Sequence, residues 1–246
     1  MCYGDQARPP APPVQGPVGE HSDLVLTSAD GTRVAAYHAH PADGSSKAIV
    51  VLPDVRGLHP FYKELARQFA EAGLHSVAID YFGRTAGFGA RDEDFPFREH
   101  VEKTEPAKIT EDVGAAVAWL RQQAGVRSVF TVGFCFGGTQ SWAQSAAGHG
   151  LAGCIGFYGG PQRIADLVPL MRVPLLMLAA GQDVTPVETV EAFAGQVRAR
   201  GVPAEVHVFP DAPHSFFDRA FAEHRDACAE AWQRMLDFID RHSRKD

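Results

Sequence analysis

Short apolar runs alternate with longer stretches of helical periodicity along most of the chain. Residues 48–52 form a continuous apolar run, which is typical of a strand that is buried on both faces. Residues 60–72 and 109–120 instead carry apolar side chains at every third or fourth position, which indicates amphipathic helices. Strands that alternate with helices predict an α/β fold with a mostly parallel central sheet and helices on both of its faces.

The same patterns predict the remaining elements of this fold. A hairpin of residues 24–27 and 34–38, with its turn at 29–31, leads the chain. A helix over 186–200 begins at a proline and ends before Gly201. Further strands are predicted at 77–79, 128–132, 152–158, 174–180 and 204–209, and a last helix at about 220–241.

Residues 81–104 interrupt the alternation. This segment contains four phenylalanines, three glycines and several charged residues, and it is long for a connection inside a compact domain. Connections of that length usually serve a function. Because the segment follows a strand end, we expect it to form a wall or a lid over a site.

A candidate nucleophile follows the strand predicted at 128–132. Residues 133–138 read Gly-Phe-Cys-Phe-Gly-Gly, which places Cys135 in the G-x-C-x-G turn between a strand and a helix. This is the nucleophile-elbow pattern of α/β-hydrolases, with cysteine in the serine position. The turn presents its central side chain at the start of a helix, where the amide dipoles favour an anion.

Two further residues follow strand-like runs in the chain order that this fold uses for its catalytic residues. Asp183 comes directly after the strand at 174–180, and His214 comes after the strand at 204–209. Catalytic groups of open α/β sheets collect at the carboxyl ends of strands. The order of nucleophile, acid and histidine therefore predicts a triad of Cys135, Asp183 and His214. Asp211 is an alternative acid, which chain order disfavours.

Length, charge and cysteine usage limit the class of protein. The 246 residues suit one domain, which we expect over residues 21–246, after an extended or mobile proline-rich arm over residues 1–20. The net charge of −7 argues against a nucleic-acid partner, and no apolar run has the length of a membrane span. The arm has no apolar core of a secretory signal, and the four cysteines show no paired spacing, so we expect a cytoplasmic protein.

Over residues 22–240 the chain resembles the dienelactone hydrolase family of α/β-hydrolases. The resemblance rests on the elbow, on the contexts of Asp183 and His214, and on the motifs Asp-Tyr-Phe-Gly-Arg at 80–84 and His-Ser-Phe at 214–216. It implies hydrolysis of a small ester or lactone through a Cys-His-Asp triad, with no cofactor and no metal. Self-association stays open.

The resemblance also implies roles for several charged residues. Asp54 matches a carboxylate that modulates the resting thiol, although the enzyme that gives the family its name has glutamate there. Arg84 matches an arginine that binds an anionic substrate, and Arg219 matches a second one with an offset of one residue. Arg56 is an additional cation in this chain.

The predicted reaction is nucleophilic attack by the Cys135 thiolate, with His214 as the base and Asp183 as the group that orients it. Backbone N–H groups of Phe136 and Val55 are the predicted oxyanion hole, and a thioester acyl-enzyme follows. Two alternatives remain at this stage. One is a carboxylesterase or thioesterase that acts on neutral acyl substrates, and the other is a non-catalytic binding protein with the same fold.

Overall fold

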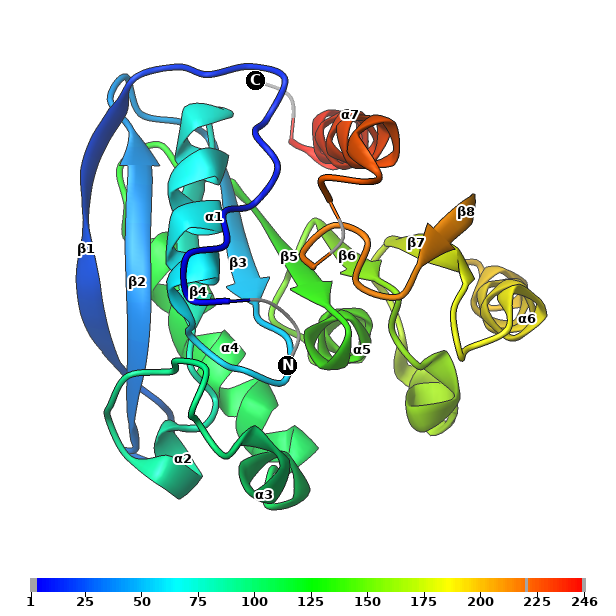
Figure 1. The fold of residues 1–246 in the computed structure, drawn as a ribbon, viewed down its shortest axis with the longest axis horizontal. Helices are drawn as coiled ribbons and strands as arrows, with labels where there is room; N and C mark the ends of the chain where they lie inside the picture. Colours follow the sequence, from blue (N-terminus) through cyan, green and yellow to red (C-terminus); the bar gives the residue numbers. More distant parts are fainter. Residues whose placement is uncertain (1–3, 220, 245–246) are drawn as a thin grey trace.

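An eight-stranded sheet forms the centre of the computed structural model, which describes residues 4–219 and 221–244 (Figure 1). The strands lie in the order β1-β2-β4-β3-β5-β6-β7-β8. The pairs β1–β2 and β2–β4 are antiparallel and the other pairs are parallel, so the predicted mostly parallel sheet is confirmed. The strands are β1 (Val18–Thr27), β2 (Arg33–Pro41), β3 (Lys47–Leu52), β4 (His75–Ile79), β5 (Ser128–Phe134), β6 (Gly153–Phe157), β7 (Leu175–Gln182) and β8 (Ala204–Pro213).

Helices cover both faces of the sheet, because each has one apolar face to bury. On one face, α1 and α7 contribute Leu65 and Trp232 to a continuous buried cluster. On the other face, α4 and α6 contribute Val113 and Phe193 to a second cluster. The helices are α1 (Pro60–Glu71), α2 (Gly83–Ala86), α3 (Phe97–Glu102), α4 (Pro106–Leu120), α5 (Phe136–Ala143), α6 (Val187–Ala199) and α7 (Arg225–His242), with the 3-10 helices η1 (Gln144–Ala146) and η2 (Pro161–Leu170).

The last helix begins later than the sequence pattern predicts. Residue Ala220, the predicted start, lies outside the described residues, and α7 begins at Arg225. The chain between β8 and α7 is a series of turns, in which Ser215 has a φ of 63°. Apolar side chains such as Phe216 and Phe217 in these turns are fully buried, so this segment packs into the core without forming a helix.

The proline-rich arm runs in an extended path over α1 and α7. The carbonyl oxygen of Pro9 accepts a hydrogen bond from Gln68 Nε2 at 3.2 Å, and that of Pro10 accepts one from Trp232 Nε1 at 2.8 Å. Both prolines are buried. Strand β1 begins at Val18, inside the segment that we predicted as the arm, and residues 1–3 lie outside the described part of the chain.

Candidate active site

The turn between β5 and α5 forces Cys135 into an unusual backbone conformation. Its φ is 54° and its ψ is −112°, a region of backbone conformation that residues other than glycine rarely adopt. The glycines around it are required by close packing. A Cβ on Gly133 would lie 1.9 Å from the carbonyl oxygen of Gly137, and a Cβ on Gly137 would lie 2.1 Å from that of Leu52. The glycine spacing therefore positions the half-buried thiol at the start of α5.

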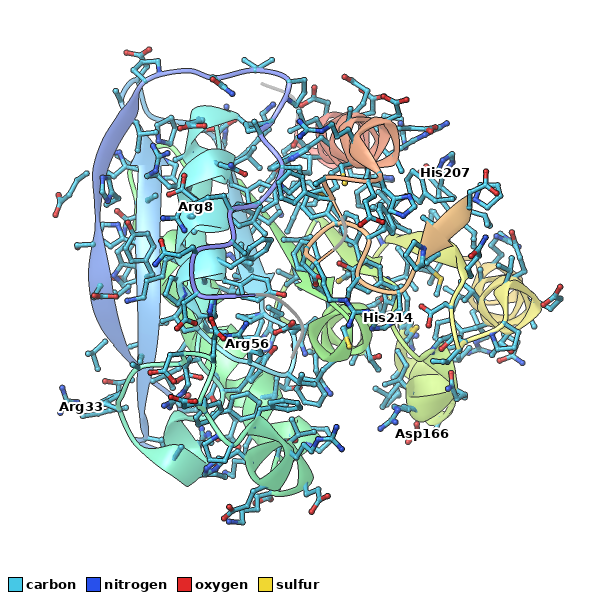
Figure 2. The ribbon with its side chains drawn as sticks, in the orientation of Figure 1. Arg8, Arg33, Arg56, Asp166, His207 and His214 are labelled. Carbon is cyan, nitrogen blue, oxygen red and sulfur yellow. The ribbon has the colours of Figure 1, made fainter. Side chains whose placement is uncertain are left out.

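The ends of β7 and β8 bring Asp183 and His214 together. The Nδ1 atom of His214 lies 3.0 Å from Asp183 Oδ1 and 2.9 Å from Asp183 Oδ2. Residue Val184 fixes this carboxylate, because its N–H donates to Asp183 Oδ1 at 2.6 Å. Figure 2 shows His214 in the turn that follows β8, beside α5, and its side chain is hydrogen-bonded to Cys135.

The partners of His214 change its charge. Burial opposes the imidazolium, but the hydrogen bonds to Asp183 and Cys135 outweigh burial and raise the pKa of His214 to about 10. The imidazole is therefore positively charged at neutral pH when the sulfur beside it is a thiolate. Asp211 is exposed on β8, and Asp183 is the carboxylate that bonds to His214.

The residues of the two predicted oxyanion donors line the same cavity as Cys135. Phe136 is the first residue of α5, where N–H groups have no partner within the helix, and both Phe136 and Val55 line the cavity that contains the thiol. Asp54 stabilises the loop that carries Val55, because its Oδ1 accepts the Arg56 N–H at 2.9 Å and its carbonyl oxygen accepts the Gly57 N–H at 3.2 Å.

The structure does not bring the three predicted arginines to this cavity. Arg84 donates to Asp112 Oδ1 and Asp30 Oδ2, both at 2.7 Å, and these bonds raise the pKa of the guanidinium. Arg56 is buried, with Nη2 3.4 Å from Asp5 Oδ1, and Figure 2 shows it apart from His214. Arg219 is exposed.

Sequence reasoning missed two residues next to His214. The ring centroid of Tyr158 lies 5.0 Å from that of His214, and the hydroxyl of Tyr158 donates to Asp218 Oδ2 at 3.2 Å. Burial raises the pKa of Asp218 to about 7, and the negative charge of Asp54 acts in the same direction. The signal for Tyr158 was its position directly after β6. No pattern indicated Asp218, because its neighbours in space come from distant parts of the chain.

A cavity of about 1030 Å³ opens above the thiol. Helix α5 lines one side of it, and the walls come from the start of α4, from η2 and from Val101, Glu102 and Thr104 at the end of the segment that we predicted as a wall or lid. The rest of that segment is anchored by a buried ion pair of 2.8 Å between Arg91 and Asp80.

In the described part of the chain, no helix is long and apolar enough to cross a membrane. No cluster of three or more His, Cys, Asp or Glu side chains suitable for a metal ion occurs among the described residues.

Comparison with solved structures defines the class of the fold as an α/β-hydrolase. A structure from Klebsiella pneumoniae, provisionally named a dienelactone hydrolase, is 26% identical, with a TM-score of 0.77 over 91% of this chain and 98% of that one. A bacterial brefeldin A esterase, 15% identical, shares the fold with a TM-score of 0.72 over 96% of this chain and 80% of its own.

The family model narrows this class. Residues 34–243 match the model of the dienelactone hydrolase family, and the chain belongs to that family. The carboxymethylenebutenolidase of Pseudomonas putida is 29% identical over 228 residues, which cover 88% of this chain and 94% of that protein. A protein of Escherichia coli K12, provisionally named a carboxymethylenebutenolidase, is 28% identical over 87% of this chain and 85% of its own. The chain is therefore a hydrolase that acts on carboxylic esters or lactones.

Proposed function

We propose that this hydrolase uses Cys135 as its nucleophile and passes through a thioester acyl-enzyme. The observation that carries the proposal is the hydrogen-bonded series Cys135–His214–Asp183 at strand ends that face one cavity. The thiolate is the reactive nucleophile of a cysteine, and the imidazole of His214 is placed to accept the thiol proton. The start of α5 adds the positive end of the helix dipole at the same place.

In the acylation step, the thiolate attacks the carbonyl carbon of the substrate and the carbonyl oxygen becomes an oxyanion. The N–H groups of Phe136 and Val55 are the proposed donors to this oxygen, and each such donor contributes about 3 kcal/mol in comparable sites. When the carbon–oxygen bond of the ester breaks, His214 gives its proton to the leaving alkoxide. The acyl group is then a thioester of Cys135.

In the deacylation step, neutral His214 removes a proton from water, and the resulting hydroxide attacks the thioester carbon. The carbon–sulfur bond breaks, the carboxylic acid leaves, and the thiolate beside protonated His214 is restored. Asp183 accepts the Nδ1–H bond throughout, so that Nε2 faces the sulfur and the reacting oxygen. No cofactor takes part in this sequence.

Hydrolysis of a p-nitrophenyl ester by Cys135→Ala tests the proposal. We expect its turnover to be indistinguishable from the uncatalysed rate. Cys154→Ala is the matched control, because Cys154 is a fully buried thiol of β6 and the variant should retain wild-type turnover. Substantial hydrolysis by folded Cys135→Ala would exclude the thiol mechanism.

A further inference from the structure

The cavity above Cys135 is larger than a small lactone requires. Its volume of about 1030 Å³ matches the upper end of the range, about 300–1,000 Å³, that encloses drug-sized ligands. Cys135, Val55 and His214 occupy only one part of its wall, and most of the other lining residues come from α4, α5, η1 and η2. The site therefore has room for a substrate that extends well beyond the reacting carbonyl group.

The room extends as a channel along α5. Thr139, Ala143 and Ala146 line the cavity at spacings of four and three residues, so they lie on one face of the helical segment. At a rise of 1.5 Å per residue, Ala146 lies about 15 Å beyond Phe136. Alanine at positions 143 and 146 leaves the channel open, because its side chain is a single methyl group.

Apolar side chains form the facing walls of the channel and part of its rim. Ile164 and Leu167 of η2 line it, as does Ala107 of α4. At the rim, Leu170 is 55% exposed and Val184 is 91% exposed, and both belong to the cavity lining. Large apolar side chains that remain exposed beside a concave site are typical of a binding surface for an apolar ligand.

The charges around the channel do not suit an anionic substrate. The charged side chains that line it, among the described residues, are Glu102, Arg163, Asp166 and His214. His214 is required for the reaction. The remaining charged side chains of the lining are two carboxylates and one guanidinium, all exposed, so the lining has an excess of negative charge. A substrate carboxylate near Arg163 would therefore also approach Asp166, which lies three residues further along η2.

A buried acid, and not the predicted Arg219, lies beside His214 at this site. Arg219 is exposed, and the neighbouring residue Asp218 is buried and accepts the hydroxyl hydrogen of Tyr158, a lining residue. Arg84 forms its ion pairs with Asp30 and Asp112 outside the cavity. The interior next to His214 is thus acidic where an anion-binding site would be basic.

We propose that the substrate is an uncharged ester with an extended apolar acyl group, which lies in the channel along α5. This inference rests on the proposed function, because it uses Cys135 as the point of attachment. The orientation follows from the chemistry. The leaving oxygen must lie beside His214, which donates its proton, so the alcohol points toward Val184 and Thr185, and the acyl group points away from them toward Ala143 and Ala146.

Three p-nitrophenyl esters test the substrate class with the wild-type protein: the acetate, the octanoate, and an octanoate that ends in a carboxylate. We expect kcat/KM to increase at least tenfold from acetate to octanoate, because buried methylene groups contribute binding energy. The terminal carboxylate should reduce kcat/KM at least tenfold relative to the octanoate. Equal rates for acetate and octanoate, or a preference for the carboxylated ester, would overturn the proposal.

Two variants test the position of the acyl group. Ala146→Phe should reduce the ratio of octanoate to acetate activity at least tenfold, because the ring fills the channel. Ala118→Phe is the matched control on the exposed side of α4, outside the cavity lining, and should leave the ratio unchanged. Ala107→Phe, at an exposed position of the facing wall, gives the same readout if Ala146→Phe does not fold. An unchanged ratio in the folded variants would contradict the channel.

The same measurements separate this inference from the proposed function. If Cys135→Ala hydrolyses the esters as fast as the wild type, the thiol mechanism fails. If hydrolysis requires Cys135 but favours acetate or the carboxylated ester, the mechanism stands and the apolar acyl channel is wrong.

Discussion

Two clusters of interacting polar side chains each include residues that follow strand ends of the same sheet, and only one of the clusters lines the cavity. The thiol cluster (Cys135, His214 and Asp183) follows β5, β8 and β7, and its thiol and imidazole line the cavity. In the arginine cluster (Arg84, Asp30 and Asp112), Arg84 follows β4, and its guanidinium is enclosed by two carboxylates of the chain itself.

The difference shows that position at a strand end is not sufficient for a role in binding. The single carboxylate of Asp183 bonds to one edge of His214 and leaves the other edge for Cys135. In the arginine cluster, Asp112 accepts from both Nε and Nη2 of Arg84, while Asp30 accepts from Nη1. A guanidinium with these partners contributes to stability, and it has little hydrogen-bonding capacity left for a substrate.

The largest loss of activity that separates the two clusters is expected from a substitution in the thiol cluster. Asp183→Asn should reduce kcat by about 10²–10⁴-fold, because the amide no longer stabilises the imidazolium or fixes its tautomer. Asp211→Asn, at an exposed carboxylate three residues before His214, is the matched control and should change kcat by less than about threefold. A greater loss of kcat in Asp211→Asn than in Asp183→Asn would show that Asp211, and not Asp183, is the acid of the cluster.

Thiol reactivity should also distinguish the cluster from the interior of the protein. Burial raises the pKa of the Cys154 and Cys228 thiols to about 12, whereas Cys135 lies beside an imidazolium and is half-buried. Iodoacetamide should therefore modify Cys135 at least ten times faster at pH 7, as measured by peptide mass spectrometry. Similar rates for the three thiols would contradict an activated nucleophile.

A substitution in the arginine cluster should lower the stability of the protein and leave its activity nearly unchanged. Arg84→Ala leaves the buried Asp112 carboxylate without its cation, and we expect the free energy of unfolding to fall by about 1.5–3 kcal/mol. The KM values for neutral and carboxylated esters should change by less than about threefold. Arg98→Ala, at an exposed arginine of α3, is the control for a surface charge. A selective rise of KM for the carboxylated ester would instead show that Arg84 binds the substrate carboxylate.

Asp218 extends the comparison to a buried carboxyl group. It accepts hydrogen bonds from the Tyr158 hydroxyl and from the backbone N–H of Arg219. Its pKa rises from 3.8 to about 7 on folding. The stability it contributes is therefore fully present below pH 3.8 and is lost as the pH rises toward 7. Urea unfolding of Asp218→Asn should show a weaker loss of stability between pH 4 and 7 than the wild type. Parallel profiles would contradict the raised pKa.

Most of the fold and the order of the thiol cluster could be predicted from the sequence, because both depend on local patterns. Apolar runs identify the buried strands, and the glycines around Cys135 are required by packing within the turn itself. The strand ends then bring Asp183 and His214 to the same edge of the sheet as Cys135.

The contacts that decide specificity could not be predicted in this way. Asp112 lies 28 residues after Arg84 in the chain, and Asp218 lies 60 residues after Tyr158. Such pairs depend on how the loops fold over the edge of the sheet. For the same reason, the sequence alone could not show that Asp218 is buried while its neighbour Arg219 is exposed.

The most direct test of the account is to detect the acyl group on Cys135. A p-nitrophenyl ester is mixed with the protein, the reaction is quenched with acid within milliseconds, and the intact protein and its peptides are weighed. We predict a mass increase of one acyl group on the peptide that contains Cys135, formed at the rate of the p-nitrophenol burst and absent in Cys135→Ala. Steady hydrolysis by the wild type with no adduct at any time, or with the adduct on another residue, would contradict the account.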